Sequence, residues 1–188
     1  MPADQTTSDA DRWDQRYADA RMPTPAAPDA LAGLDIEVPR SGRAVDVACG
    51  TGAQTLWLAE RGLNVVALDV SPRAIEVLAA AVQSRRLSPR VETRTLSLHD
   101  GLPGDLRDVD VLVCQRFRDP VLYIPFVSAV RPGGIGIVTV LSTVGPDGEP
   151  GPFHAPPGEL SAAFDRHDTE MLLDVEADGL ASVVFRRR

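Results

Sequence analysis

The stretch Val45-Asp46-Val47-Ala48-Cys49-Gly50-Thr51-Gly52 decides the fold. Residues 44–48 form a short, mostly apolar run that predicts a buried strand, and residues 53–61 carry apolar side chains at helical spacing. The glycines Gly50 and Gly52 lie between the two segments, and glycine allows a sharp turn and a close ligand approach because it has no Cβ. The stretch therefore predicts a strand, a tight turn and a helix, the place where open parallel sheets bind ligands.

Strands and helices alternate along most of the remaining chain. Strands are expected at residues 64–68, 90–96, 109–114 and 135–141, and helices at 72–86, 120–130 and 158–164. Residues 170–176 and 180–186 are two further strand candidates, and the short connection Ala177-Asp178-Gly179 between them is typical of an antiparallel hairpin. The pattern predicts an α/β fold with a mainly parallel sheet, helices on both faces and an antiparallel hairpin at its end.

The composition excludes several classes of protein. The chain of 188 residues has a net charge of -8, which disfavours a nucleic-acid partner, and the closing Arg186-Arg187-Arg188 is expected to be a solvated tail. No apolar run approaches the ~20 residues that span a bilayer, and no secretory signal is visible. Two cysteines, Cys49 and Cys114, form neither a disulfide framework nor a metal site. We expect a cytoplasmic protein without a membrane partner or a metal.

The sequence also predicts the domain organisation. Residues 1–10 are expected to be a disordered tail, and residues 11–188 a single domain. Within that domain, residues 11–42 hold a short helix, at 11–21, and a proline-rich connector, and residues 43–188 form the sheet core.

The acidic residue Asp69 indicates that the predicted ligand contains adenosine. Asp69 follows Gly50 by 19 residues and ends the second strand, where a carboxylate accepts hydrogen bonds from both ribose hydroxyls. The dinucleotide fingerprint has a third glycine where this chain has Thr55. A pyrophosphate needs close packing of the helix at this position, so Thr55 disfavours an NAD-dependent oxidoreductase. Such an enzyme remains an alternative interpretation.

The same residues carry a resemblance to a family. Asp46 to Gly52 resembles the first motif of class I S-adenosylmethionine-dependent methyltransferases, with Ala48 in place of a glycine. Asp69 matches the ribose-binding acid of that family, and Arg131-Pro132-Gly133-Gly134 matches its turn before the fifth strand. The resemblance covers residues 43–141. It implies a Rossmann-like fold with a seven-stranded sheet in the order 3-2-1-4-5-7-6, S-adenosylmethionine as cofactor and S-adenosylhomocysteine as product.

The N-terminal helix carries a second resemblance. Trp13-Asp14-Gln15-Arg16-Tyr17 is similar to a segment of small methyltransferases of the tellurite-resistance and thiopurine groups, in which this helix covers the methionine end of the cofactor. That implies a cofactor contact from Arg16 or Arg21, although Trp13 and Tyr17 one turn apart also fit simple docking on the core. The candidates for the adenine contact are Ser97, His99 and Asp100, of which Asp100 is favoured. The full set of expected cofactor residues is Trp13, Arg16, Asp46, Ala48, Cys49, Gly50, Thr51, Gly52, Asp69, Val70, Ser97, Leu98, Asp100 and Gln115.

The acceptor side is the least defined part of the sequence. Candidate segments are residues 114–120 and 151–159, with His154 as a proton acceptor and Arg116 as a second catalytic candidate. Residues 142–158 are rich in Gly and Pro, as in a lid. The resemblance predicts in-line methyl transfer, and the acidic surface favours a small-molecule acceptor. The acceptor atom and the oligomeric state, monomer or homodimer, stay open. A non-catalytic S-adenosylmethionine-binding protein is the other alternative.

Overall fold

The computed structural model describes residues 3–145, 151 and 153–188, which fall into two compact units. The first unit combines Met1–Ala27 with Pro39–Gly101, and the second combines Pro28–Val38 with Leu102–Arg188. The elements of the first unit are α1 (Ala3–Tyr17), β1 (Arg43–Val47), α2 (Ala53–Glu60), β2 (Asn64–Asp69), α3 (Pro72–Ser84), β3 (Val91–Thr95) and the 3-10 turn η2 (Leu98–Asp100).

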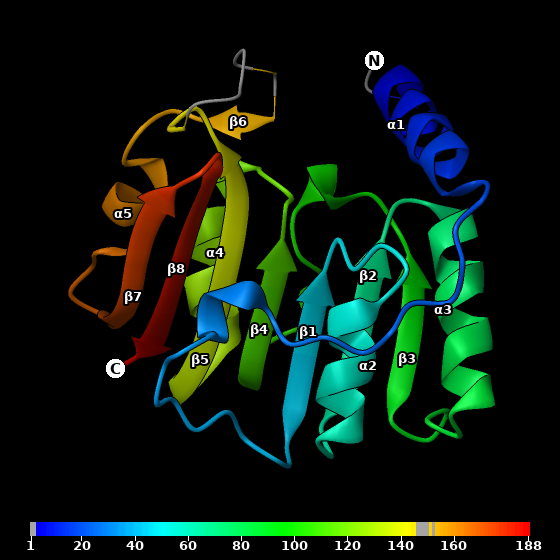
Figure 1. Ribbon diagram of the computed structural model, residues 1–188, viewed down its shortest axis with the longest axis horizontal. Helices are drawn as coiled ribbons and strands as arrows, with labels where there is room; N and C mark the ends of the chain where they lie inside the picture. The colour runs from blue at the N-terminus through cyan, green and yellow to red at the C-terminus, as the bar shows by residue number, and fades with distance from the viewer. Residues whose placement is uncertain (1–2, 146–150, 152) are drawn as a thin grey trace. The chain divides into compact units, whose positions relative to one another are not determined.

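The first unit is built on three parallel strands in the order β3-β2-β1. Asp46 pairs with Ala67 in β2, and Asp69 at the end of β2 pairs with Thr95 in β3, so the carboxyl ends of the strands meet at one edge. α3 begins where the sequence predicts, because the Ser71 side chain accepts a hydrogen bond from the Ala74 amide and Pro72 occupies the first turn. α1 lies beyond the arrowheads of β2 and β3 (Figure 1).

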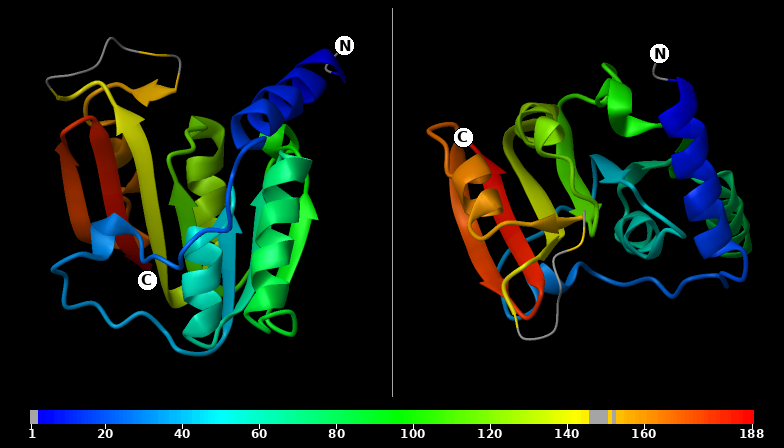
Figure 2. Two further views of the ribbon diagram at one scale, coloured as in Figure 1. Left: turned by 45° about the vertical axis from the view of Figure 1, so that its right-hand side comes forward. Right: turned by 90° about the horizontal axis from the view of Figure 1, so that it is seen from above.

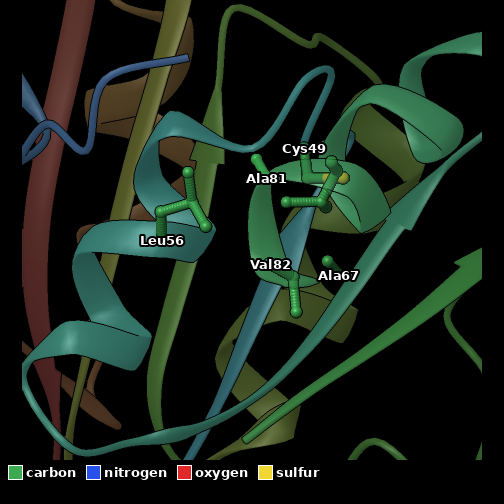
Figure 3. Close-up of a cluster of buried hydrophobic side chains, with 6 residues drawn as sticks. Cys49, Leu56, Ala67, Ala81 and Val82 are labelled. Carbon is green, nitrogen blue, oxygen red and sulfur yellow. The ribbon is translucent and has the colours of Figure 1, made fainter. Parts of the chain in front are cut away.

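The core of the first unit joins the glycine loop to its two helices. Figure 3 shows part of this core, in which Cys49 from the loop lies near side chains of β2 and α3. The buried members of the cluster are Cys49, Leu56, Ala67, Leu78, Ala81 and Val82. Because the loop contributes a buried side chain to the core, its backbone is held in place by apolar packing as well as by hydrogen bonds.

The second unit holds the end of the sheet and its hairpin. Its elements are the 3-10 turn η1 (Asp29–Leu31), β4 (Val109–Gln115), the 3-10 turn η3 (Pro120–Leu122), α4 (Tyr123–Ala129), β5 (Val130–Ser142), β6 (His154–Ala155), α5 (Glu159–Phe164), β7 (Thr169–Ala177) and β8 (Leu180–Arg187). β4 and β5 are parallel, β8 is antiparallel to both β5 and β7, and β6 is parallel to the end of β5.

The predicted fold is confirmed: it is Rossmann-like, with mostly parallel strands and a C-terminal antiparallel pair. The strand order within each unit is the predicted one, 3-2-1 in the first and 4-5-7-6 in the second, when β6 is left out of the count. The described residues hold one strand more than the predicted seven, because the two residues of β6 pair with Leu141 and Ser142. The predicted turn at Arg131–Gly134 lies inside β5, as an irregularity in its pairing with β4. The assignment of residues 11–188 to a single domain stays a prediction.

The prediction for the N-terminus is wrong in its boundaries. α1 begins at Ala3 and ends at Tyr17, so it includes most of the predicted disordered tail and stops short of Arg21. The predicted helix at 11–21 carries Trp13 and Tyr17, and the residues before Trp13 are polar or small. The helix extends further because no Gly or Pro interrupts residues 3–17, and because Asp9 and Arg12 form an ion pair of 2.9 Å one turn apart.

The C-terminal arginines are not the expected solvated tail, since β8 extends to Arg187. The guanidinium of Arg187 donates hydrogen bonds to the carbonyls of Ser128 (2.9 Å) and Val130 (2.5 Å). These carbonyls lie at the end of α4, where a cation is favoured by the helix dipole. None of the helices in the described part of the chain is long and apolar enough to cross a membrane.

Candidate cofactor-binding site

The loop between β1 and α2 has an unusual backbone. Ala48, Gly50 and Gly52 have φ values of 53°, 53° and 90°, all in the left-handed region. The Cys49 amide donates to the Leu68 carbonyl (2.8 Å) and thereby ties the loop to β2. Ala48 replaces a glycine of the family motif, and it keeps the left-handed conformation that glycine adopts more readily. Strain of this kind is typical of functional loops.

The two glycines of the loop are needed for different reasons. A Cβ on Gly52 would lie 2.3 Å from Leu78 Cδ1, inside the buried core. A Cβ on Gly50 would lie 2.7 Å from the hydroxyl of Tyr17, which comes from α1. Gly52 therefore allows α3 to pack against the loop, whereas Gly50 allows a hydroxyl group to lie directly over the loop backbone.

Asp69 is held in a fixed orientation by the backbone. Gly50 N–H donates to Oδ2 (2.7 Å) and Ser71 N–H donates to Oδ1 (2.9 Å). Burial raises the pKa of Asp69, and the two amide donors act in the opposite direction. Each carboxylate oxygen has further lone pairs, so the pair of oxygens can accept the two hydroxyls of a ribose, as the sequence predicts.

A second carboxyl group lies in the neighbouring strand, β1. Asp46 is only 1% exposed, and Thr55 Oγ1 donates to its Oδ2 (2.5 Å). Burial raises the pKa of Asp46 to about 7, and the nearby charge of Asp69 adds to the shift. Thr55 stands at the position of the third dinucleotide glycine, so its hydroxyl stabilises a carboxyl group where a pyrophosphate-binding protein packs a glycine. Sequence reasoning missed this contact.

The backbone of Cys49 belongs to the glycine loop, whereas its thiol is buried in the core. The side chain is buried in the core of the first unit, and burial raises the pKa of the thiol well above its usual value. A protonated, buried thiol is a poor nucleophile. Thr51, the neighbour of Gly50 in the loop, is half-buried.

Among the α1 residues, Tyr17 reaches the loop. Arg16 is exposed, and its guanidinium lies 5.7 Å from the centre of the half-buried Trp13 ring. The Trp13 and Tyr17 rings are stacked, with centroids 6.1 Å apart. Burial raises the pKa of Tyr17 to about 12, with Asp69 as the next cause. The predicted cofactor contacts of Trp13 and Arg16 stay predictions.

The residues after β2 and β3 adjoin Asp69. Leu96 N–H donates to the Asp69 carbonyl (2.9 Å). Ser97 is half-buried and caps η2 by accepting a hydrogen bond from His99 N–H (3.3 Å). Asp100 is exposed, whereas Leu98 is buried and Val70 half-buried. The choice between Ser97 and Asp100 for the adenine contact stays open.

The predicted acceptor-side residues belong to the second unit. Gln115 ends β4, and Arg116 follows it with a φ of 59° while its N–H donates to the Thr139 carbonyl (2.7 Å). His154 is half-buried in β6, and its Nδ1 accepts a hydrogen bond from Gly151 N–H (3.1 Å). The lid predicted at residues 142–158 falls partly outside the described residues.

Sequence reasoning missed a polar cluster in the second unit. Arg118 donates two hydrogen bonds to Glu159 at the start of α5, at 2.8 and 2.5 Å, and the Tyr123 hydroxyl donates a third at 2.8 Å. The Arg118 guanidinium holds the pKa of Glu159 below its usual value, and burial raises the pKa of Tyr123. The cluster fixes the segment after β4 to α5. Among the described residues, no group of three or more His, Cys, Asp or Glu side chains could hold a metal ion.

The geometry of the first unit defines a class of protein. A strained glycine loop between β1 and α2, with an oriented carboxylate at the end of β2, is the arrangement by which Rossmann-like proteins hold an adenosine-containing cofactor. Residues 44–134 match the family model described as a methyltransferase domain. The matched segment is just under half of the chain, and it resembles the methyltransferase domains whose cofactor is S-adenosylmethionine.

The similar proteins agree with this family. An uncharacterized methyltransferase of Mycobacterium tuberculosis is 40% identical over 111 residues, which cover 56% of this chain and 43% of that protein. The chain thus spans less than half the length of these curated relatives. TehB from Haemophilus influenzae has a similar fold, with a TM-score of 0.73 and 18% identity over 95% of this chain and 67% of that one. A geranyl diphosphate C-methyltransferase from Streptomyces coelicolor, solved with S-adenosylhomocysteine, has a TM-score of 0.71 and 14% identity over 100% of both chains.

Proposed function

We propose that this protein transfers the methyl group of S-adenosylmethionine to a small-molecule acceptor. The observation that carries the proposal is Asp69, whose carboxylate is oriented by the amides of Gly50 and Ser71 beside the glycine loop. The loop backbone would accommodate the cofactor, and Asp69 would accept hydrogen bonds from its ribose hydroxyls. The buried Asp46 adds a second carboxyl group, which suits a cofactor that carries a sulfonium cation.

The chemistry asks mainly for positioning. The cofactor supplies an activated methyl group, so the chain has to bind it, align the acceptor with it and exclude water. His154 stays the proposed proton acceptor; because its Nδ1 accepts the Gly151 N–H, the neutral ring carries its own hydrogen on Nε2, and Nδ1 would take up a proton only after that hydrogen bond breaks. Arg116 is proposed as an acceptor-side contact, since its left-handed backbone at the end of β4 is typical of functional positions.

A small molecule is the proposed acceptor, and a cytoplasmic location is the proposed setting. The net charge of -8 disfavours a nucleic acid, and two similar methyltransferases act on small molecules by name, geranyl diphosphate in one case and magnesium-protoporphyrin in the other. The magnesium-protoporphyrin O-methyltransferase of Rhodobacter capsulatus is 39% identical over 66 residues, which cover 25% of it. Cys49 and Cys114 are both buried thiols, which suits a reducing compartment.

Two experiments test the proposal. Calorimetry with S-adenosylhomocysteine should show binding to the folded protein, and an absence of binding at ligand concentrations near ~1 mM would refute it. A screen of small molecules with a labelled methyl donor should then identify an acceptor. Cofactor binding combined with a sealed methyl group in a cofactor-bound structure would favour a non-catalytic binding protein instead.

A further inference from the structure

β3 is the outermost strand of the first unit. In the described part of the chain, Val91–Thr95 pairs with β2 alone, and Figure 2 shows β3 behind α3 in its left-hand view, at the margin of this unit. None of the five side chains of the strand is fully buried. The edge of a sheet is a template for pairing with a further strand, because its outward N–H and C=O groups have no ladder partner.

The register with β2 shows which backbone groups of β3 face outward. Val65 N–H donates to the Arg90 carbonyl (2.7 Å), and Leu96 N–H donates to the Asp69 carbonyl (2.9 Å). In a parallel pair, every second residue directs its N–H and C=O toward the neighbouring strand. The even-numbered residues of this segment therefore face β2, and the outward groups belong to Val91, Thr93 and Thr95. An antiparallel strand centred opposite Thr93 would form hydrogen-bonded pairs at all three positions.

The side chains of β3 suit a second copy of the same strand. Glu92 and Arg94 lie on one face, where Arg94 Nε donates to Glu92 Oε1 (2.7 Å), and their side chains are 59% and 26% exposed. In an antiparallel pair centred on Thr93, Glu92 of each copy lies opposite Arg94 of the other, at the positions where facing side chains come closest. A guanidinium has five donors, so Arg94 can contact a second carboxylate as well.

The two ends of β3 carry opposite charges. The turn before the strand holds the exposed Arg86 and Arg90, and Asp100 after the strand is also exposed. Asp9 of α1 lies at the same end as Asp100, with its Oδ2 3.5 Å from Nε2 of His99. An antiparallel partner would bring the basic end of one strand beside the acidic end of the other, and the two-fold symmetry would repeat this contact.

The edge strand of the second unit lacks this complementarity. Within the described residues, β7 pairs with β8 alone. Its charged residues are all acidic, namely Glu170, Asp174 and Glu176, so two copies of β7 would repel each other. Charged side chains are a common protection of edge strands against pairing. The opposite charges of Glu92 and Arg94 do not give this protection against a second copy of β3.

We propose that two copies of this chain associate by antiparallel pairing of their β3 strands about a two-fold axis at Thr93. The pairing joins the strands β3-β2-β1 of both copies into one continuous sheet, and the same surface is used on each copy. Backbone hydrogen bonds supply the attraction, and the two contacts between Glu92 and Arg94 set the register. The pairing uses no atom of Asp69 or of the glycine loop, so it does not depend on the proposed function.

Sedimentation equilibrium over a range of protein concentrations tests the proposal. The unaltered chain should show a reversible monomer–dimer equilibrium. Glu92→Arg and Arg94→Glu should each weaken the dimer at least ~10-fold, because like charges then face each other at both positions. The double variant Glu92→Arg/Arg94→Glu should restore the dimer to within about threefold, because it only exchanges the two charges. As a matched control in the second unit, the exposed Arg188→Glu should leave the equilibrium unchanged.

Thr93→Pro tests the backbone contacts without a change in charge. The Thr93 N–H faces away from β2, so proline removes an outward donor and should be tolerated at this edge. The variant should fold, as thermal unfolding would show, and should stay monomeric. If it fails to fold, the charge exchange still decides the register.

Two results would overturn the inference. A monomeric unaltered chain at ~0.5 mM would exclude the dimer and would leave an extended peptide of another protein as the occupant of the edge. A dimer that persists unweakened in Arg94→Glu or in folded Thr93→Pro would show that the interface lies elsewhere on the chain.

Discussion

Replacement of Asp46 by asparagine should stabilise the cofactor-free protein increasingly as the pH rises. Burial raises the pKa of Asp46 from 3.8 to about 7, so at intermediate pH the folded state holds a proton that the unfolded state has lost. Because the folded state then binds more protons, stability falls with rising pH between these two values. Asparagine cannot ionise, and its amide oxygen can still accept the Thr55 hydroxyl.

The magnitude follows from the two pKa values. One proton corresponds to about 1.4 kcal/mol for each pH unit, so the difference in unfolding free energy between Asp46→Asn and the unaltered chain should grow by roughly 2–3 kcal/mol from about pH 4.5 to pH 6.5. Above about pH 8 it should level off. Urea denaturation at several pH values measures it, with the exposed Asp174→Asn as the control for net charge. A difference that does not change with pH would refute the burial argument.

Three further predictions use other contacts. Gly52→Ala should destabilise the fold by about 2–4 kcal/mol in urea denaturation, because its Cβ would lie 2.3 Å from Leu78; Gly104→Ala, whose Cβ would approach nothing closer than 3.7 Å, should not. Asp69→Asn should weaken S-adenosylhomocysteine binding at least ~10-fold in calorimetry, with thermal unfolding as the check on folding. Glu159→Gln should cost about 1–2 kcal/mol at neutral pH. The pKa of Glu159 is lowered by its arginine partner, so this cost should be complete above pH 4.5 and shrink as the pH falls below it in acid denaturation.

The fold could be predicted because its signals are local. The glycine loop, the Ser71-Pro72 helix start and the Asp-Gly hairpin each depend on a few neighbouring residues whose backbone preferences are strong. The errors occurred where the spacing of apolar residues gives no signal. α1 extends upstream of Trp13 without apolar spacing, and β6 is two residues that become a strand only by pairing with β5.

The site was predictable for the same reason, and only as far as the loop and Asp69. Both follow from the position of strand ends along the chain, which the sequence displays directly. The contact of Thr55 with Asp46 joins residues nine positions apart, and the contact of Asp14 with Ser71 joins residues 57 positions apart. Neither pair has a sequence signature, because the partners meet only when α2 and α1 pack on the strands. The acceptor side depends on contacts of the same kind, such as Arg118 with Glu159.

Two features at the carboxyl end of β1 reduce the stability of the cofactor-free protein. Ala48 has a left-handed backbone there, and Asp46 resists ionisation beside the buried Asp69. A cation close to these two carboxyl groups would favour their charged forms, so binding of a sulfonium cofactor would lower the pKa of Asp46 and release a proton. The uncharged sulfur of the product lacks this interaction. If the methionine end of the cofactor lies near Asp46, the buried carboxyl groups therefore bind the cofactor more tightly than its product. The burial that destabilises the cofactor-free protein is the source of this preference.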